Sequence, residues 1–516
     1  MKQRKFFEAN IQSKHTAIVR KFLLPILILF AIVVLCAGLC LNYSVSYLIS
    51  HFNDVPLGQL LFHLHTPLDG TNISAFSDVI ENIIKTLLVT ISLFIIGYYL
   101  FHRFQKHLPY ILSCIVLGIA LIGNSLHNLD LHFDLKTYYT FTKMKTELYD
   151  KYYVDGRDIQ LDFPDVKRNL IYIYLESMET TFADKKTGGA FEINLIPQLT
   201  QLSLENISFS DDGILNGGVV LEGSTYTMGA LVAQTSGVTI NTRLLHPSFV
   251  NETYESDYNI MPGAWTLGDV LHQQGYNQEF MCGSDGKFAG RASYFKGHGN
   301  YNVIDYYNAI EQGRIPEGYY VWWGFEDEKL FSLAKEDILR MASENVPFNF
   351  SMLTVDTHFT DGYYCELCEN EYASQYSNVI SCSDRQVADF IIWVQQQDFY
   401  ENTTIVLAGD HLTMDSEYMS NMGVDNYLRK TYFTIINPPS KLAEKEQPRQ
   451  YTTCDFYPTT LAALGVNIEG NRLGLGVNLF SDEPTLLEEF DQKYLNGELL
   501  KSSNLYTKKL LYNNNP

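Results

Sequence analysis

The hydrophobic pattern of the chain changes near residue 125. Before that point, long uncharged apolar runs occupy residues 22–41, 86–101 and 108–123. The first run is longer than the apolar core of a cleaved signal peptide, and no small-x-small cleavage motif follows it cleanly. A helix needs about 20 apolar residues to cross a bilayer, so we predict that residues 1–125 form an anchor of about three transmembrane helices.

After residue 165, short apolar runs rich in β-branched residues alternate with amphipathic stretches. This alternation is typical of an α/β layer structure with a mostly parallel sheet. We therefore expect an extracytoplasmic domain at 165–516, joined to the anchor by an aromatic and charged connector at 126–164. The strands are predicted at 169–175, 348–355 and 403–409, and the helices at 227–234, 265–275, 383–397 and 457–465.

The distribution of charge predicts how the chain is oriented in the membrane. The chain carries 37 basic and 59 acidic residues, a net charge of -22, which argues against a nucleic-acid partner. The basic residues lean toward the front: Lys or Arg occurs before the first span and again at 102–107, but nowhere in 43–82. Because basic loops stay in the cytoplasm, we expect a cytoplasmic N-terminus and place the domain at 165–516 on the outer side of the membrane.

The cysteines divide between the two regions. Cys36, Cys40 and Cys114 lie in the predicted spans, where they are small apolar residues; Cys282, Cys365, Cys368, Cys382 and Cys454 lie in the outer domain. The sequence CELC at 365–368 could be half of a zinc site, but no second CxxC or histidine pair accompanies it. We expect instead a disulfide among Cys365, Cys368 and Cys382, because an outer compartment permits disulfides.

Groups that bind metals follow each of the three predicted strands. Glu176 follows the first strand, Asp356 and His358 follow the second, and Asp410 and His411 follow the third. One such residue after a strand is usually a turn or cap residue. Ligands bind at the carboxyl ends of parallel strands, however, and three strand ends of this kind together favour a metal site.

A candidate nucleophile lies in the sequence LEGSTYTMGALVAQ at 221–234. It offers hydroxyl groups at Ser224, Thr225 and Thr227, just where a helix is predicted to begin. Ser and Thr are also ordinary helix caps, so the composition of this stretch does not by itself establish a catalytic role. A hydroxyl beside a divalent ion, near the positive end of a helix, would nevertheless be suited to attack a phosphate.

A series of motifs in a fixed order resembles the sulfatase-like phosphoglycerol transferases, a family that includes lipoteichoic acid synthases and periplasmic glucan-modifying enzymes. The motifs are IYIYLESMETTF, EGSTYTMG, FAGRASYFKGHG, TVDTHFTDG, AGDHLT, DFYPTTLAALG and NRLGLGVNLF, within about residues 165 to 482. The resemblance implies an alkaline-phosphatase/sulfatase-like α/β sandwich and a two-step transfer through a covalent threonine ester.

Site residues carry over from this resemblance one by one. The metal ligands match Glu176, Asp410 and His411, and the nucleophile, which is also a ligand, matches Thr225, with Ser224 and Thr227 close by. The metal would be one divalent ion, Mn²⁺ or Mg²⁺ rather than zinc. Phosphoglycerol-binding residues match Arg291 and His358.

The chain also departs from the family pattern. Ala289 stands where the family has a tryptophan two residues before the arginine, which implies a differently built glycerol pocket. The CxPxR motif of true sulfatases is absent, so sulfate-ester hydrolysis is not expected.

The resemblance implies an enzyme of the bacterial inner membrane that takes phosphoglycerol from phosphatidylglycerol and gives it to a glucan or another hydroxyl acceptor. Within the same fold, the alternatives are a phosphoethanolamine transferase and a lipoteichoic-acid-type glycerol-phosphate polymerase. A phosphodiesterase that uses water, and an inactive binding or sensor homologue, are the alternatives from other classes.

Overall fold

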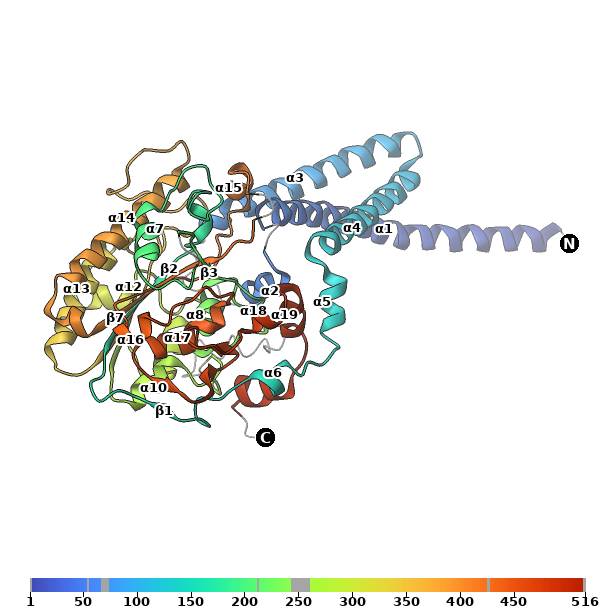
Figure 1. Ribbon diagram of the computed structural model, residues 1–516. Coiled ribbons are helices and arrows are strands. Elements are labelled where there is room, and N and C mark those ends of the chain that lie inside the picture. The colour runs from blue at the N-terminus through green and yellow to red at the C-terminus, as the bar shows by residue number, and fades with distance from the viewer. Residues whose placement is uncertain are drawn as a thin grey trace. The chain divides into compact units, whose positions relative to one another are not determined.

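The computed structural model describes residues 2–52, 55–65, 74–210, 213–242, 260–424 and 427–513. The chain divides into two compact units (Figure 1). One unit comprises Met1–Asn53 and Ile73–Lys136, and the other comprises Asp54–Asn72 and Thr137–Pro516.

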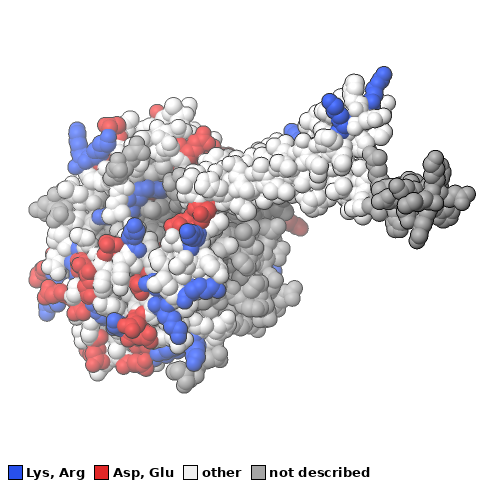
Figure 2. Space-filling view, turned by 90° about the vertical axis from the view of Figure 1, so that its right-hand side faces the viewer, with Lys and Arg blue, Asp and Glu red and all other residues white. Residues whose placement is uncertain are grey.

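The first unit is built from the long helices α1 (Lys2–Phe52), α3 (Ser74–Arg103) and α4 (His107–Phe133). Among the described residues, three helical segments are long and apolar enough to cross a membrane: Phe22–Ser50, Ile80–Arg103 and His107–Phe133. The face of these helices that Figure 2 shows is mostly uncharged, with basic side chains near one end. Large apolar side chains such as Phe22 and Leu88 are exposed. The three predicted apolar helices are therefore confirmed, and each extends beyond the run from which it was predicted.

A mixed sheet forms the centre of the second unit. Among the described residues its strand order is β3-β8-β7-β2-β6-β4-β5. The strands β7, β2, β6, β4 and β5 are parallel, whereas β8 runs antiparallel to β7 and to β3. The bounds are β2 Asn169–Leu175, β3 Gly217–Gly218, β4 Asn277–Cys282, β5 Asn302–Ile304, β6 Phe348–Leu353, β7 Thr403–Gly409 and β8 Thr431–Ile436. This confirms the predicted mostly parallel α/β sheet.

Side chains of β2 alternate between two hydrophobic cores, as the two-residue period of a strand requires. Leu170, Tyr172 and Tyr174 enter one core, and Ile171, Ile173 and Leu175 enter the other. Helices α8 (Thr227–Ser236), α10 (Leu267–Gln273), α11 (Arg291–Gly297) and α17 (Phe456–Ala463) supply the first core. Helices α7 (Pro197–Glu205), α12 (Tyr306–Glu311), α13 (Asp327–Ser343) and α14 (Gln375–Gln395) supply the second, so the sheet lies between two helical layers (Figure 1).

The predicted strands and helices are found close to their predicted positions. Strands β2 and β7 have the predicted bounds, and β6 ends two residues before its predicted end at 355. Helix α14 begins at Gln375 rather than at 383. Its first two turns are almost wholly buried, and they carry polar Ser and Asn residues that mask the apolar period in the sequence.

The second unit also contains short helices and strands that come before and after the central sheet in the sequence. Segment α5 (Leu135–Phe141) and α6 (Leu148–Tyr152) lead to β1 (Leu161–Asp162), which pairs with β9 (Asn467–Ile468). The remaining helices and strands are α2 (Leu57–His65), α15 (Ser416–Asn421), α16 (Ser440–Ala443), β10 (Arg472–Leu473), β11 (Gly476–Val477), α18 (Leu486–Glu489) and α19 (Gln492–Leu499). Helix α2 belongs to this unit although it lies between α1 and α3 in the sequence.

Candidate active site

Three potential metal ligands meet where β2 and β7 end. These strands are parallel neighbours, and the pairing of Leu175 with Gly409 makes both strands end at the same level. Glu176 and Asp410 therefore leave the sheet side by side, with His411 next in the chain. The ligand atoms of Glu176, Asp410 and His411 all lie within 4.8 Å of one another. The side chains are buried, with 2 % of Glu176 and 0 % of Asp410 and His411 exposed.

Hydrogen bonds fix the two carboxylates in this position. One oxygen of Asp410, Oδ1, accepts from the backbone N–H groups of Ser177 (2.8 Å) and His411 (2.7 Å). Oε1 of Glu176 accepts from the Ser177 hydroxyl at 2.7 Å. Ser177 has a φ of 52°, a left-handed conformation that is uncommon for residues other than glycine and is often found at functional sites. This turn therefore points one backbone donor and one hydroxyl donor at the two carboxylates.

The imidazole of His411 is oriented by a backbone carbonyl. Its Nδ1 lies 2.8 Å from the carbonyl oxygen of Leu412, which only accepts, so Nδ1 carries the proton. The other ring nitrogen, Nε2, is the one that would bind a metal, and it lies 3.4 Å from Oε1 of Glu176 and 3.5 Å from Oδ2 of Asp410. Metal-binding histidines are commonly oriented in this way by a carbonyl at the second nitrogen.

The residues present fit a divalent cation. Oδ2 of Asp410 is buried and has no hydrogen-bond partner among the described residues, which is costly for a carboxylate oxygen. Burial, and then the charge of Glu176, raise the pKa of Asp410 to about 8. Burial alone would raise the pKa of Glu176, but the nearby positive groups, His411 first, lower it overall. Two carboxylates and an imidazole form a donor set suited to Mn²⁺, Mg²⁺ or Zn²⁺.

Of the three candidate hydroxyls, Thr227 is the one that lies beside this cluster. Its Oγ1 is 3.3 Å from Nε2 of His411 and donates to Oε2 of Glu176 at 3.5 Å. By contrast, Thr225 donates to Oε1 of Gln59 at 2.7 Å, and Ser224 donates to the carbonyl of Leu221 at 2.9 Å. The hydroxyl beside the cluster therefore belongs to Thr227, two residues after Thr225, which the resemblance matched to the nucleophile.

Thr227 is held in place by the helix that it begins. It is the first residue of α8, where the exposed N–H groups and the helix dipole favour a negative charge. The side chain of Gln234, farther along α8, donates to the carbonyls of Gly409 (2.9 Å) and Asp410 (3.2 Å). These bonds connect α8 to the end of β7, so the hydroxyl and the cluster share one rigid support.

Arg291 and His358, the predicted substrate-binding residues, lie at neighbouring strand ends. Arg291 begins α11 after β4 and is 5 % exposed; its guanidinium donates to the carbonyls of Phe288 (3.2 Å) and Asp285 (2.9 Å). Its positive charge contributes to the lowered pKa of Glu176. Burial lowers the pKa of His358, whose Nδ1 lies 2.7 Å from the carbonyl of Phe359. His358 is therefore neutral near pH 7, with Nε2 as an acceptor.

An aromatic wall beside these residues was not found from the sequence. The ring of Trp323 lies 4.8 Å from that of His358 and 5.5 Å from that of Phe288, measured between centroids. Trp323 comes from the loop before α13, far in the sequence from Ala289, which replaces the tryptophan expected in the arginine motif. The pair of tryptophans in VWWG was the feature that could have identified this loop.

Helix α2 contributes a further contact that the sequence did not indicate. Gln59 accepts from Thr225 and also donates to the sulfur of Met414, close after His411. Phe62 stacks on Tyr226 with ring centroids 4.4 Å apart. Helix α2 therefore packs against Thr225 and Tyr226, the two residues before α8.

A buried ion pair lies next to the turn and the loop that carry the site residues. Glu179, fully buried, accepts from Nε and Nη2 of Arg429 at 2.9 and 2.6 Å. The same carboxylate accepts from the backbone N–H of Thr413, and Arg429 donates to the Thr413 carbonyl. This pair connects the turn after β2 to the loop that follows His411.

The comparisons with known proteins agree with this arrangement. The sulfatase family profile matches residues 168–466, which include all of the site residues described above except those of α2. Phosphoglycerol transferase I of Salmonella choleraesuis (strain SC-B67) is 30 % identical over 334 residues, covering 62 % of this chain and 40 % of the relative. Phosphoglycerol transferase I of Xanthomonas campestris pv. campestris (strain B100) is 27 % identical over 365 residues, covering 69 % and 49 % respectively. The chain thus spans less than half the length of these curated relatives.

Among solved structures, the lipoteichoic acid synthase LtaP from Listeria monocytogenes is similar over 65 % of this chain and 81 % of that one. It has a TM-score of 0.48 and 16 % sequence identity. The resemblance inferred from the ordered motifs is confirmed by the sequence relatives and by the family profile. Because that profile covers residues 168–466 of 516, this chain belongs to the sulfatase family.

Proposed function

We propose that this protein is a membrane-anchored, metal-dependent phosphotransferase that moves phosphoglycerol from phosphatidylglycerol to the hydroxyl group of a glucan. The observation that carries the proposal is the position of the Thr227 hydroxyl against Nε2 of His411 and Oε2 of Glu176. The names of the curated relatives support the phosphoglycerol group, and the three apolar helices support a lipid donor. The proposed catalytic domain faces the outside of the inner membrane, with the N-terminus in the cytoplasm.

In this proposal Glu176, Asp410, His411 and the Thr227 oxygen would hold one divalent ion, Mn²⁺ or Mg²⁺. Such an ion would favour loss of the Thr227 proton at neutral pH and would neutralise charge on the phosphate. Thr227 replaces Thr225 in the roles of nucleophile and ligand, because the Thr225 hydroxyl is bound to Gln59.

The first step forms a bond between the Thr227 oxygen and phosphorus and breaks the bond from phosphorus to the diacylglycerol oxygen. The Thr227 proton is lost, and the departing oxygen takes up a proton, so diacylglycerol leaves. In the second step, the acceptor hydroxyl loses its proton and attacks the threonine phosphodiester, and the Thr227 oxygen leaves. A water molecule in place of the acceptor would release glycerol phosphate.

The other residues of the site bind the substrate. The guanidinium of Arg291 would neutralise phosphate oxygens, since its planar fork matches their geometry. The neutral His358 presents Nε2 to accept a hydrogen bond from a substrate hydroxyl, and the Trp323 ring beside it offers an apolar face to the glycerol carbons.

A headgroup-transfer assay tests the proposal. The full-length protein in detergent is incubated with Mn²⁺, a β-glucan and phosphatidylglycerol labelled in the headgroup glycerol, and diacylglycerol release and label transfer are followed. We expect release with label on the glucan, and, without acceptor, a Thr227 peptide that carries the mass of a glycerophosphoryl group. Thr227→Ala should abolish both, and Thr225→Ala is the matched control.

The same assay separates the alternatives. Consumption of labelled phosphatidylethanolamine, but not phosphatidylglycerol, would assign a phosphoethanolamine donor. Label in a glycerol-phosphate chain would indicate a polymerase, and label only in free glycerol phosphate would indicate a phosphodiesterase. Absence of turnover of either lipid, in protein that binds Mn²⁺, would contradict the transferase proposal.

A further inference from the structure

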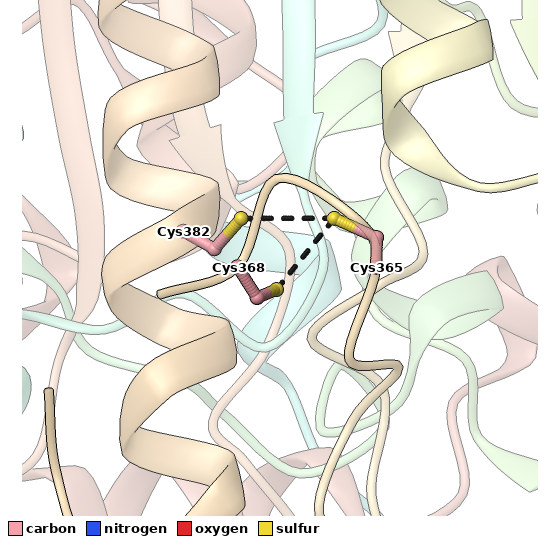
Figure 3. Close-up of side chains that lie close together, drawn as sticks. All are labelled: Cys365, Cys368 and Cys382. Atoms are coloured by element: carbon pink, nitrogen blue, oxygen red, sulfur yellow. Dashed lines mark hydrogen bonds between the residues drawn. The ribbon is translucent and has the colours of Figure 1, made fainter. Parts of the chain in front are cut away.

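A second group of potential metal ligands lies on the loop between β6 and α14. Cys365 and Cys368 belong to this loop, and Cys382 lies on α14; Figure 3 shows their three sulfur atoms pointing toward one another. Cys365 and Cys382 are 3 % and 2 % exposed. None of these residues belongs to the site around Thr227.

The distances between the sulfur atoms distinguish a disulfide from a metal site. A disulfide requires about 2.05 Å between sulfurs. The Sγ atom of Cys365 lies 3.6 Å from that of Cys368 and 3.7 Å from that of Cys382, and all three cysteines are unbonded. Three thiolates about 2.3 Å from one tetrahedral zinc ion are separated by about 3.8 Å. The expected disulfide is therefore not found among these cysteines, and the spacing is that of sulfurs around a shared ion.

An amide group lies beside two of the sulfur atoms. The amide nitrogen Nε2 of Gln386 lies 3.4 Å from the sulfur of Cys382 and 3.8 Å from that of Cys365. Donors of this kind orient metal-binding thiolates and reduce their excess negative charge.

Gln386 provides a second, independent indication of a ligand. Gln386 lies one helical turn after Cys382. Its side-chain oxygen Oε1 is buried and has no hydrogen-bond partner among the described residues. A buried amide oxygen without a partner is costly. A metal-bound water at the fourth tetrahedral position would supply the missing donor.

We propose that Cys365, Cys368 and Cys382 bind one zinc ion as thiolates, with a fourth position left to water. Zinc suits this site because soft sulfur ligands prefer it over Mg²⁺ or Mn²⁺. Binding releases the protons of those thiols that were still protonated. The ion connects the loop that begins with Asp356 and His358 to α14, and so fixes the segment that carries the candidate substrate-binding histidine. This site is independent of the phosphotransfer proposed at Thr227.

Cobalt substitution of the full-length protein tests the proposal. The reduced, metal-free protein in detergent is titrated with Co²⁺, whose bonds to thiolate give a near-ultraviolet charge-transfer band that carboxylate and imidazole ligands do not give. We expect this band in the wild type and its loss when Zn²⁺ is added. A reduced wild-type protein that binds Co²⁺ without the band would overturn the proposal.

Two alanine variants with equally buried cysteines provide the matched comparison. Cys382 and Cys454 are each 2 % exposed, but Cys454 lies outside the cluster. Cys382→Ala should weaken the band strongly, and Cys454→Ala should leave it unchanged; equal bands in both variants would contradict the proposal. Cys368→Ala, at the less buried cysteine, repeats the test if Cys382→Ala does not fold.

The metal in the protein as isolated gives an independent reading. Zinc X-ray absorption of protein purified without reductant should show sulfur neighbours at about 2.3 Å. A Cys365 disulfide in zinc-free protein would overturn the assignment. Because Thr227→Ala should keep the cobalt band, failure of the transfer assay and failure of this site are distinguishable.

Discussion

The hydroxyl of Thr227 lies 3.3 Å from Nε2 of His411, although 184 residues separate the two in the sequence. The contact exists because α8 begins beside the end of β7 and is bonded to it through Gln234. Each half of the site has a simple local role: Thr227 begins a helix, and His411 follows a strand. Only their proximity makes the Thr227 hydroxyl the candidate nucleophile of our proposal, while the hydroxyls of Ser224 and Thr225 are bonded to Leu221 and Gln59.

Removing the Thr227 hydroxyl should remove the transfer activity. We expect Thr227→Ala to lower kcat at least about 1000-fold, as for loss of a covalent nucleophile. Thr227→Ser keeps a hydroxyl and should retain measurable activity. Thr225→Ala should cost less than about tenfold, because it loses one hydrogen bond to Gln59. Diacylglycerol release is the measurement, and a larger loss in Thr225→Ala than in Thr227→Ala would return the nucleophile to Thr225.

Mn²⁺ affinity should increase with pH up to about pH 8. The pKa of Asp410 in the metal-free protein is raised to about 8, so below that pH the ion must displace a proton from the carboxyl group. The affinity should therefore rise by up to about tenfold per pH unit and then level off. Calorimetric titration with Mn²⁺ between pH 6 and pH 9, as the test range, measures it; an affinity that falls over this range would contradict the assignment.

The same titration has a matched pair of variants. Asp410→Asn should weaken Mn²⁺ binding at least about 100-fold and reduce its pH dependence. Asp384 is an equally buried aspartate, but its carboxylate accepts from the backbone N–H groups of Gln198 and Leu199 at the start of α7. Asp384→Asn should therefore leave Mn²⁺ affinity unchanged.

Trp323 should contribute to substrate binding. Its ring adjoins His358, so we expect Trp323→Ala to raise KM by about 3- to 10-fold, which corresponds to one aromatic contact. The control is Trp393→Ala, at another half-buried tryptophan, on α14, where it packs against Phe390. Steady-state kinetics with the lipid donor should show the change in KM only for Trp323→Ala; equal effects would indicate that both variants act through folding.

The ion pair below the site should matter for stability. Arg429→Ala leaves the buried carboxylate of Glu179 without its partner, so we expect a loss of about 3–5 kcal/mol in the free energy of unfolding. Replacing both residues, as Glu179→Gln with Arg429→Met, should recover part of this loss. Urea unfolding in detergent is the measurement.

An exposed pair is the control for this prediction. Lys151 and Glu147 lie 2.8 Å apart on the surface, with 63 % and 76 % of their side chains exposed. Lys151→Ala should cost less than about 0.5 kcal/mol. If Arg429→Ala costs no more than this, the buried pair does not support the loop after His411.

The sequence by itself determined the layers of the protein and the chemical type of its site. Apolar runs of membrane-spanning length and strands such as 169–175 and 403–409 are local patterns, because the burial of a helix or strand is repeated along a short stretch of chain. Glu176, Asp410 and His411 were predictable together, because parallel strands end at the same edge of a sheet.

Only the tertiary structure decided which of several chemically similar residues lie beside the site. Ser224, Thr225 and Thr227 lie within four positions of the sequence. Which of their three hydroxyls lies beside His411 depends on how α8 and α2 pack. Trp323 and the ion-pair partner Arg429 come from segments distant in the sequence from His358 and Glu179, which they contact. Such contacts are formed by packing of the whole domain and leave no period in the local sequence, so only the folded chain shows them.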